Sequence, residues 1–78
     1  ARAAAHGQAF GPDRALAALD ALAQAGRDYQ PWHAARAHWL ARAGDRPGAQ
    51  AAYERAAALS ADPAVRAFLL EKRAALHA

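Results

Sequence analysis

Apolar side chains recur every three or four positions along much of the chain. Leu16, Leu19 and Leu22 form one such series, and Trp32 and Trp39 fall near one face of another. This spacing puts the apolar residues of a segment on one side of an α-helix. No segment alternates apolar and polar residues with a period of two, which is the pattern of a half-buried strand. The pattern therefore predicts an all-α fold.

Prolines, glycines and aspartates mark the ends of the predicted helices. The first nine residues read as the end of a helix that stops at Gly7 or at Gly11. Asp45 and Asp62 each precede a proline in a first helical turn, where aspartate caps the helix and proline is tolerated. Gly26 and Gly44 are expected to end helices as C-terminal caps. The predicted helices cover residues 12–26, 31–44, 46–59 and 63 onward.

Residues 31–59 are predicted to form two antiparallel helices joined by a tight turn. Ala37, Ala49 and Ala56 are small at the positions where two such helices would come closest. In the second helix of the pair, Tyr53 is expected on the packed side and Glu54 on the side nearer water. Tetratricopeptide hairpins have this organisation, and each hairpin buries its apolar face by stacking on another copy.

A weaker copy of the second helix of this hairpin lies 34 positions upstream, which is the tetratricopeptide period. At this spacing Leu19 corresponds to Tyr53, and Asp20 corresponds to Glu54. Alanine is so common in the chain that matches between alanines carry little weight, so the larger pairs support the repeat. The expected fold is therefore a set of tetratricopeptide-like antiparallel helix hairpins with a C-terminal capping helix.

The core must depend on a few large residues, because alanine supplies most of the 55% hydrophobic content and has little apolar area to bury. In the last helix an inner face of Val65, Phe68, Leu69 and Leu76 is expected. The expected core residues are Phe10, Leu16, Leu19, Leu22, Tyr29, Trp32, Trp39, Leu40, Tyr53, Leu59, Val65, Phe68, Leu69, Leu70 and Leu76.

With 78 residues the chain is expected to form a single domain over residues 1–78. It starts at Ala1 rather than methionine, and its first ten residues resemble the tail of a helix, so we expect a C-terminal fragment of a longer protein. It shows no signal peptide and no apolar run long enough to cross a membrane. The absence of cysteine excludes disulfides and thiolate metal sites and fits a cytoplasmic protein.

No arrangement of residues predicts catalysis, a metal or a cofactor. His33 and His38 are five positions apart, whereas a helical metal site needs ligands three or four apart with a further ligand nearby. Ser60, the single serine, stands at a helix end, where capping is its expected role. The glycines lie at separate turns and form no phosphate-binding loop. We therefore expect neither an enzyme nor a site for a small-molecule substrate.

The formal net charge of +3 includes nine arginines and one lysine, a balance that raises the question of nucleic-acid binding. A nucleic-acid surface would gather arginines on one helix face. Here they are spread over every predicted element, which is typical of an evenly solvated surface. Arg36 differs because it shares a face with Trp32 and Trp39. It is expected to stack on an indole or to pair with a carboxylate such as Glu71.

Aromatic residues supply the remaining candidate binding surface. Two tryptophans in one short helix exceed what a small alanine-rich core needs. Trp39 is expected in the core, whereas Trp32 lies near the helix start, where a neighbouring domain could cover it. We predict a protein-binding surface that includes Tyr29, Trp32 and Arg36.

Four segments of the chain carry recognisable motifs. Residues 29–44 follow the pattern Y-x-x-x-x-A-x-R-x-x-x-L-x-R-x-G, and residues 52–59 follow A-Y-E-R-A-x-x-L. Residues 11–22 follow G-P-x-x-x-L-x-x-L-D-A-L, and residues 66–73 follow R-A-F-L…R. Together these segments resemble a C-terminal extension found in a group of extracytoplasmic-function (ECF) RNA polymerase sigma factors. The chain departs from the family at Pro31, Trp32 and Trp39, where aliphatic residues are usual.

The resemblance implies a helical extension that follows the promoter-binding domains of a sigma factor and controls activity by protein contact. Its partners would be the sigma core domains, RNA polymerase or a regulatory protein, and DNA would be contacted only through domains absent from this sequence. Two alternatives remain open. A free-standing tetratricopeptide adaptor would bind a peptide through a cluster of Lys and Arg, and a nucleic-acid-binding helical domain would show salt-sensitive affinity.

Overall fold

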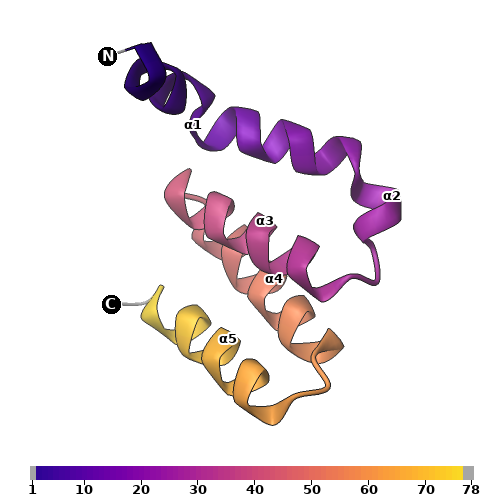
Figure 1. Ribbon diagram of the computed structural model, residues 1–78. Coiled ribbons are helices and arrows are strands. Elements are labelled where there is room, and N and C mark those ends of the chain that lie inside the picture. Colours follow the sequence, from indigo (N-terminus) through magenta and orange to yellow (C-terminus); the bar gives the residue numbers. More distant parts are fainter. Residues whose placement is uncertain (1, 77–78) are drawn as a thin grey trace.

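The computed structural model describes residues 2–76, with side chains for residues 11–76, and all regular secondary structure within that range is helical. All-α architecture, as predicted, is confirmed. The helices follow one another along the chain and pack as antiparallel neighbours (Figure 1). The helices are α1 (Arg2–Ala21), α2 (Ala23–Gly26), α3 (Gln30–Arg42), α4 (Arg46–Leu59) and α5 (Pro63–Ala75).

The centre of the fold is the contact between α3 and α4, the most extensive in the structure. Ala37, Ala49 and Ala56 are completely buried there. Small side chains at such positions allow two packed helices to approach closely. The three alanines predicted at the helix contact are thus buried in one cluster with residues of both helices.

Larger side chains close the core around this alanine contact. Leu40 and Tyr53 are buried, and Leu69 of α5 joins them from the other side of α4. Burial raises the pKa of the Tyr53 phenol, because its ionised form would lose hydration. As predicted, Tyr53 lies on the packed side of α4 and Glu54 on the exposed side.

A tight turn joins α3 to α4 and satisfies the backbone groups of both helix ends. Gly44 has a φ of 88°, a left-handed conformation that favours glycine. The amide of Asp45 donates to the Leu40 carbonyl at 2.9 Å, and the amide of Gly44 donates to Ala41 at 3.1 Å. These two bonds form a Schellman cap. The Asp45 carboxylate then accepts from the Gly48 amide at 2.9 Å, as the predicted N-cap of α4.

The connection from α4 to α5 is capped by side chains at both helix ends. The Ser60 hydroxyl donates to the Ala56 carbonyl at 2.8 Å, which confirms its predicted capping role. Asp62 accepts from the Ala64 amide at 2.9 Å and caps the start of α5, also as predicted. Arg66 donates to the Ser60 carbonyl at 2.9 Å and ties this turn to the first turn of α5.

The N-terminal third of the chain is less regular than predicted. Gly11 bends α1, with a φ of 39° and a ψ of −175°, at one of the two predicted break points. The helix predicted over 12–26 is broken again at Leu22, whose φ of −108° and ψ of 16° separate α1 from α2. The amide of Leu22 donates to Leu19 across only three residues, so the last turn of α1 is tightened.

Several residues predicted in the core are exposed instead, and each lies at the edge of the helix array. Leu22 and Tyr29 face outward beside the α2–α3 connection, and they are 58% and 61% exposed. On α5, Leu69 packs against α4, while the other face of the helix has no described neighbour. The prediction that Val65 and Phe68 lie on an inner face of α5 together with Leu69 is therefore wrong. The large apolar residues of α5 that are exposed are Val65, Phe68 and Leu70.

Trp39, which was predicted in the core, is only half-buried. Its ring is flanked by Arg42, whose Cζ lies 6.0 Å from the ring centroid, and by His38.

The predicted core residue Phe10 lies outside the described side chains. Among the described residues, no helix is long and apolar enough to span a membrane.

Candidate protein-binding groove

An apolar groove of about 310 Å³ lies where the end of α1 and the short α2 meet the beginning of α3. Apart from backbone groups and the Tyr29 hydroxyl, its walls offer little polar surface. Two of its side chains, Leu22 and Tyr29, are the most exposed large apolar residues among the described side chains. The groove is lined by Leu19, Leu22, Ala25, Gly26, Tyr29, Pro31, Trp32 and Ala35.

Trp32 holds the two walls of the groove together. Its indole N–H donates a 3.0 Å hydrogen bond to the Leu19 carbonyl, from the first turn of α3 to the last turn of α1. In an uninterrupted helix the amide of Ala23 would occupy that carbonyl. The break at Leu22 leaves the carbonyl accessible, so the indole and the tightened turn share it as an acceptor.

Gly26 allows Trp32 to lie directly on α2. A Cβ added at Gly26 would lie 2.3 Å from the Trp32 Cγ and 2.6 Å from its Cδ2, closer than any side chain tolerates. Gly26 ends α2 at the predicted residue. Its φ is not positive, so the glycine is required by the approach of the indole rather than by a left-handed cap.

Arg36 and His33 complete the surroundings of the Trp32 ring. The Arg36 guanidinium carbon lies 5.9 Å from the ring centroid, which is within the range of a cation–π contact. His33 meets the ring edge-on with centroids 4.8 Å apart.

The predicted stacking of Arg36 on an indole is confirmed, but the prediction that Glu71 is its carboxylate partner is wrong. Arg36 instead pairs with Asp20 at 3.9 Å, because α3 packs beside α1 while α5 lies beyond α4.

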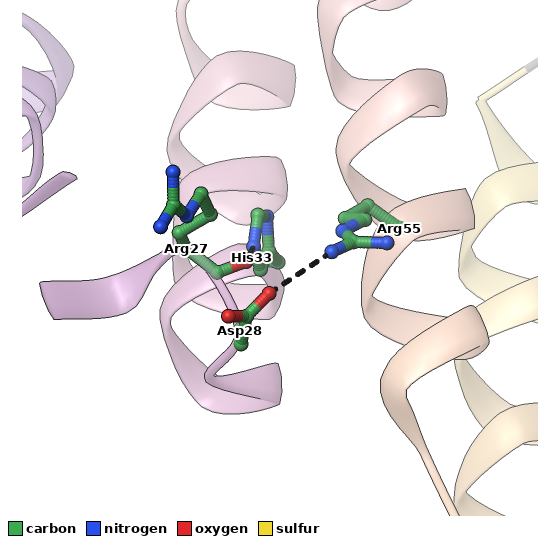
Figure 2. A network of polar contacts seen from close by, with 4 residues as sticks. All are labelled: Arg27, Asp28, His33 and Arg55. Atoms are coloured by element: carbon green, nitrogen blue, oxygen red, sulfur yellow. Dashed lines mark hydrogen bonds and ion pairs between the residues drawn. The ribbon is translucent and has the colours of Figure 1, made fainter. Parts of the chain in front are cut away.

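A small polar network fixes the connection between α2 and α3 (Figure 2). His33 lies with its Nε2 2.7 Å from the Arg27 carbonyl, and a carbonyl can only accept, so Nε2 carries the proton. Asp28 reaches toward α4 and pairs with Arg55 at 3.3 Å. These contacts place Tyr29, the next residue, at the mouth of the groove.

The predicted site residues are partly brought together by the structure. Tyr29 and Trp32 line the groove, and Arg36 stands behind Trp32 on the next turn of α3. Sequence reasoning missed Leu22 as a groove residue, because its place in the apolar series of α1 predicts burial. One signal in the sequence could have indicated this site: Gly26, six positions before Trp32, leaves room for the indole ring to pack against the backbone. Binding at these residues stays a prediction.

A second, smaller hollow of about 230 Å³ lies at the α4–α5 turn. Its Ser60 hydroxyl is engaged with the Ala56 carbonyl and its Asp62 carboxylate with the Ala64 amide, so both polar groups serve as caps. Within the described residues, no three His, Asp or Glu side chains are placed to hold a metal ion. Of the histidines, His6 and His77 lie outside the described side chains.

The chain matches no protein-family model, and no curated protein or solved structure matches it significantly.

Proposed function

We propose that this chain is a helical protein-interaction module that acts by contact with another protein domain. The observation that carries the proposal is the apolar groove, in which Leu22 and Tyr29 remain exposed next to the half-buried Trp32. Contiguous apolar surface on a small domain marks protein interaction sites, and aromatic residues anchor such contacts. Among the residues that line the groove, Tyr29 alone carries a titratable group.

The proposed architecture is two tetratricopeptide-like helix pairs with α5 as the capping helix. Residues 12–26 correspond to α4 at a spacing of 34 positions, and α3 corresponds to α5 within one residue of that spacing. The main helix contacts link α1 with α3, α3 with α4, and α4 with α5. Contacts limited to neighbouring elements are typical of stacked helical repeats.

The proposed context is the C-terminal regulatory extension of an ECF-type RNA polymerase sigma factor. The support is the resemblance of residues 11–22, 29–44, 52–59 and 66–73 to that extension, together with a groove suited to protein contact. The module would act in the cytoplasm on transcription initiation. Its partner would be the sigma core domains, the polymerase or a regulatory protein.

The first test is the sequence that precedes Ala1 in its gene. A sigma-type helix-turn-helix there supports the proposed context, and a continuous array of further helical repeats contradicts it.

The second test measures whether another domain covers the groove. In a Trp39→Phe background, Trp32 is the single tryptophan of this domain, so its acrylamide quenching reports its exposure. We expect quenching at Trp32 to fall when the neighbouring domains of the full-length protein are present, after subtraction of any tryptophan those domains contribute. Equal quenching in the isolated domain and the full-length protein contradicts docking at the groove.

The alternatives receive less support from the geometry. Arg36, Arg55 and Arg73 are each paired with a carboxylate, which reduces the positive charge available to nucleic-acid phosphates. A peptide adaptor would need basic side chains in the groove, but His38 and Arg42 flank Trp39 and neither lines the groove. A gel-shift titration whose affinity falls steeply with salt would favour nucleic-acid binding over the proposal.

A further inference from the structure

The break between α1 and α2 has no cause in the sequence around it. Residues 13–25 contain neither proline nor glycine, and alanine, the residue that most favours a helix, recurs among them. The chain nevertheless leaves the helical conformation at Leu22, and the α2 that follows is only four residues long. Sharp breaks in helices come from proline, from glycine or from a group inserted into the backbone hydrogen bonds. An inserted group is therefore the remaining cause.

The inserted group is the indole of Trp32. Its N–H donates to the Leu19 carbonyl at 3.0 Å, and the Leu22 amide donates to the same oxygen at 2.9 Å. A backbone carbonyl has two lone pairs, so both are occupied. The amide of Ala23, which an uninterrupted helix would direct to this carbonyl, is therefore excluded from it. Because Trp32 belongs to α3, the break depends on tertiary structure.

Contacts of the indole on both sides of the break offset its cost. Every helix start leaves amides without a partner inside the helix, and no side chain caps the start of α2 at Leu22. The Trp32 ring lies against the backbone of Gly26, where an added Cβ would be 2.3 Å from the Trp32 Cγ. The same ring is bonded to the last turn of α1. Trp32 thus holds α1 and α2 in their broken arrangement.

We infer that residues 12–26 form a two-state helix, which is broken at Leu22 while the Trp32 indole holds the Leu19 carbonyl and continuous when the indole leaves it. The groove belongs to the broken state, because its walls lie on both sides of the break and include the indole itself. The continuous state is the helix that the sequence predicts over 12–26. The inference specifies how the groove is regulated, and it rests on the proposed function only where binding is concerned.

The two states link the Trp32 bond to binding at the groove. A partner that binds the groove in its present shape favours the broken state to the extent that it prefers that state. By reciprocity, the indole bond favours the same partner by populating the broken state. A net hydrogen bond changes a two-state ratio by about two- to tenfold, which sets the size of the effect.

The test follows the break by NMR spectroscopy in the complete 78-residue chain. Trp32→Phe removes the donor, whereas Gly26→Ala keeps the donor and places a Cβ where the indole lies. In both variants we expect the Cα chemical shift of Leu22 to move toward the helical value. Exchange of the Ala23 amide should slow, because a continuous helix bonds it to Leu19. The ratio of continuous to broken helix should rise about two- to tenfold in Trp32→Phe.

Trp39→Phe is the matched control, because it changes the other half-buried tryptophan of α3 and leaves the donor at the break in place. No change at Leu22 or Ala23 is expected with it. In the unsubstituted chain, the indole proton of Trp32 should exchange more slowly than that of Trp39, since it is bonded to the Leu19 carbonyl. This comparison needs no substitution, so it applies even if a variant does not fold.

Unchanged signals of Leu22 in both variants would overturn the inference. The same change in Trp39→Phe, or equal exchange of the two indole protons, would overturn it as well. None of these results decides whether a partner binds the groove. Conversely, equal quenching of Trp32 in the isolated domain and the full-length protein would contradict docking and leave the two-state helix intact.

Discussion

The indole N–H of Trp32 and the backbone carbonyl of Leu19 are joined by a 3.0 Å hydrogen bond that links the first turn of α3 to the broken end of α1. The bond explains two irregularities together. The helix predicted over 12–26 stops short at Leu22, and a half-buried tryptophan lies at the start of α3. It also makes Trp32 a structural residue of the groove as well as a candidate anchor for a partner.

The Trp32 bond predicts a difference between the two tryptophans. Trp32→Phe removes the donor and is expected to lower the free energy of unfolding by about 1 kcal/mol more than Trp39→Phe, since a net hydrogen bond contributes about 0.5–1.5 kcal/mol. Both rings are half-buried, and Trp39 makes no hydrogen bond through its indole within the described residues. Urea unfolding followed by circular dichroism measures the difference. Equal losses in the free energy of unfolding would mean that the hydrogen bond from Trp32 to Leu19 does not stabilise the fold.

Gly26→Ala is expected to destabilise the domain, although alanine favours a helix more than glycine does. The new Cβ would lie 2.3 Å from the Trp32 Cγ, and overpacking of this kind costs about 1–3 kcal/mol. The same change in a Trp32→Ala background should be neutral or stabilising, because the obstructing ring is gone. A double-mutant cycle of unfolding free energies gives the coupling. A coupling near zero would contradict the contact between Gly26 and the indole.

The close approach of α3 and α4 predicts that Ala56 cannot be enlarged. Ala56→Leu inserts a branched side chain at a completely buried position, and a loss of about 1–3 kcal/mol or more is expected. Ala58→Leu is the matched control, because Ala58 lies on the same helix with its side chain in solvent. The control should change the free energy of unfolding by less than about 0.5 kcal/mol. Thermal unfolding of the two variants separates packing from helix propensity, and similar midpoints would contradict the close approach.

Tyr53 makes stability fall at alkaline pH. Burial raises the pKa of its phenol, whereas an unfolded tyrosine titrates at about pH 10. Above that pH the unfolded state releases its proton first and binds fewer protons than the folded state, so the free energy of unfolding declines with rising pH. The contribution is complete below about pH 10 and is lost as the pH rises through the folded-state pKa.

The measurement for Tyr53 is urea unfolding between about pH 8 and 11, compared with Tyr53→Phe. The variant keeps the ring and removes the ionising group, while every other side chain is the same in both proteins. We expect a smaller alkaline loss in the variant. If the free energy of unfolding falls equally with pH in the two proteins, folding does not raise the pKa of Tyr53.

Much of the fold follows from local signals in the sequence. Asp45 and Asp62 cap the helices that they were predicted to cap, because a carboxylate beside free amides acts within a few residues. The buried alanines of the α3–α4 contact were likewise predicted from their positions in a hairpin. These features depend on residues close in the sequence, or on the one-turn periodicity of a single helix.

The exposed residues could not be predicted in the same way. Leu22 and Phe68 continue apolar series that are typical of a core, and only the number of helices stacked on each side decides whether such a face is covered. The groove depends on a backbone break at Leu22 and on the bond from Trp32, which no single-helix pattern contains. A groove formed between two helices that are separate in the sequence can therefore be recognised only in the three-dimensional structure.

The short turn at Gly44 has a consequence for biosynthesis. Because α3 and α4 adjoin in the chain and form the largest contact, little loop entropy opposes their pairing, and helical domains with such local contacts fold in about microseconds to milliseconds. A ribosome adds only about 5–20 residues per second. The hairpin can therefore assemble as soon as Leu59 emerges, so α5 meets a finished surface when it leaves the exit tunnel.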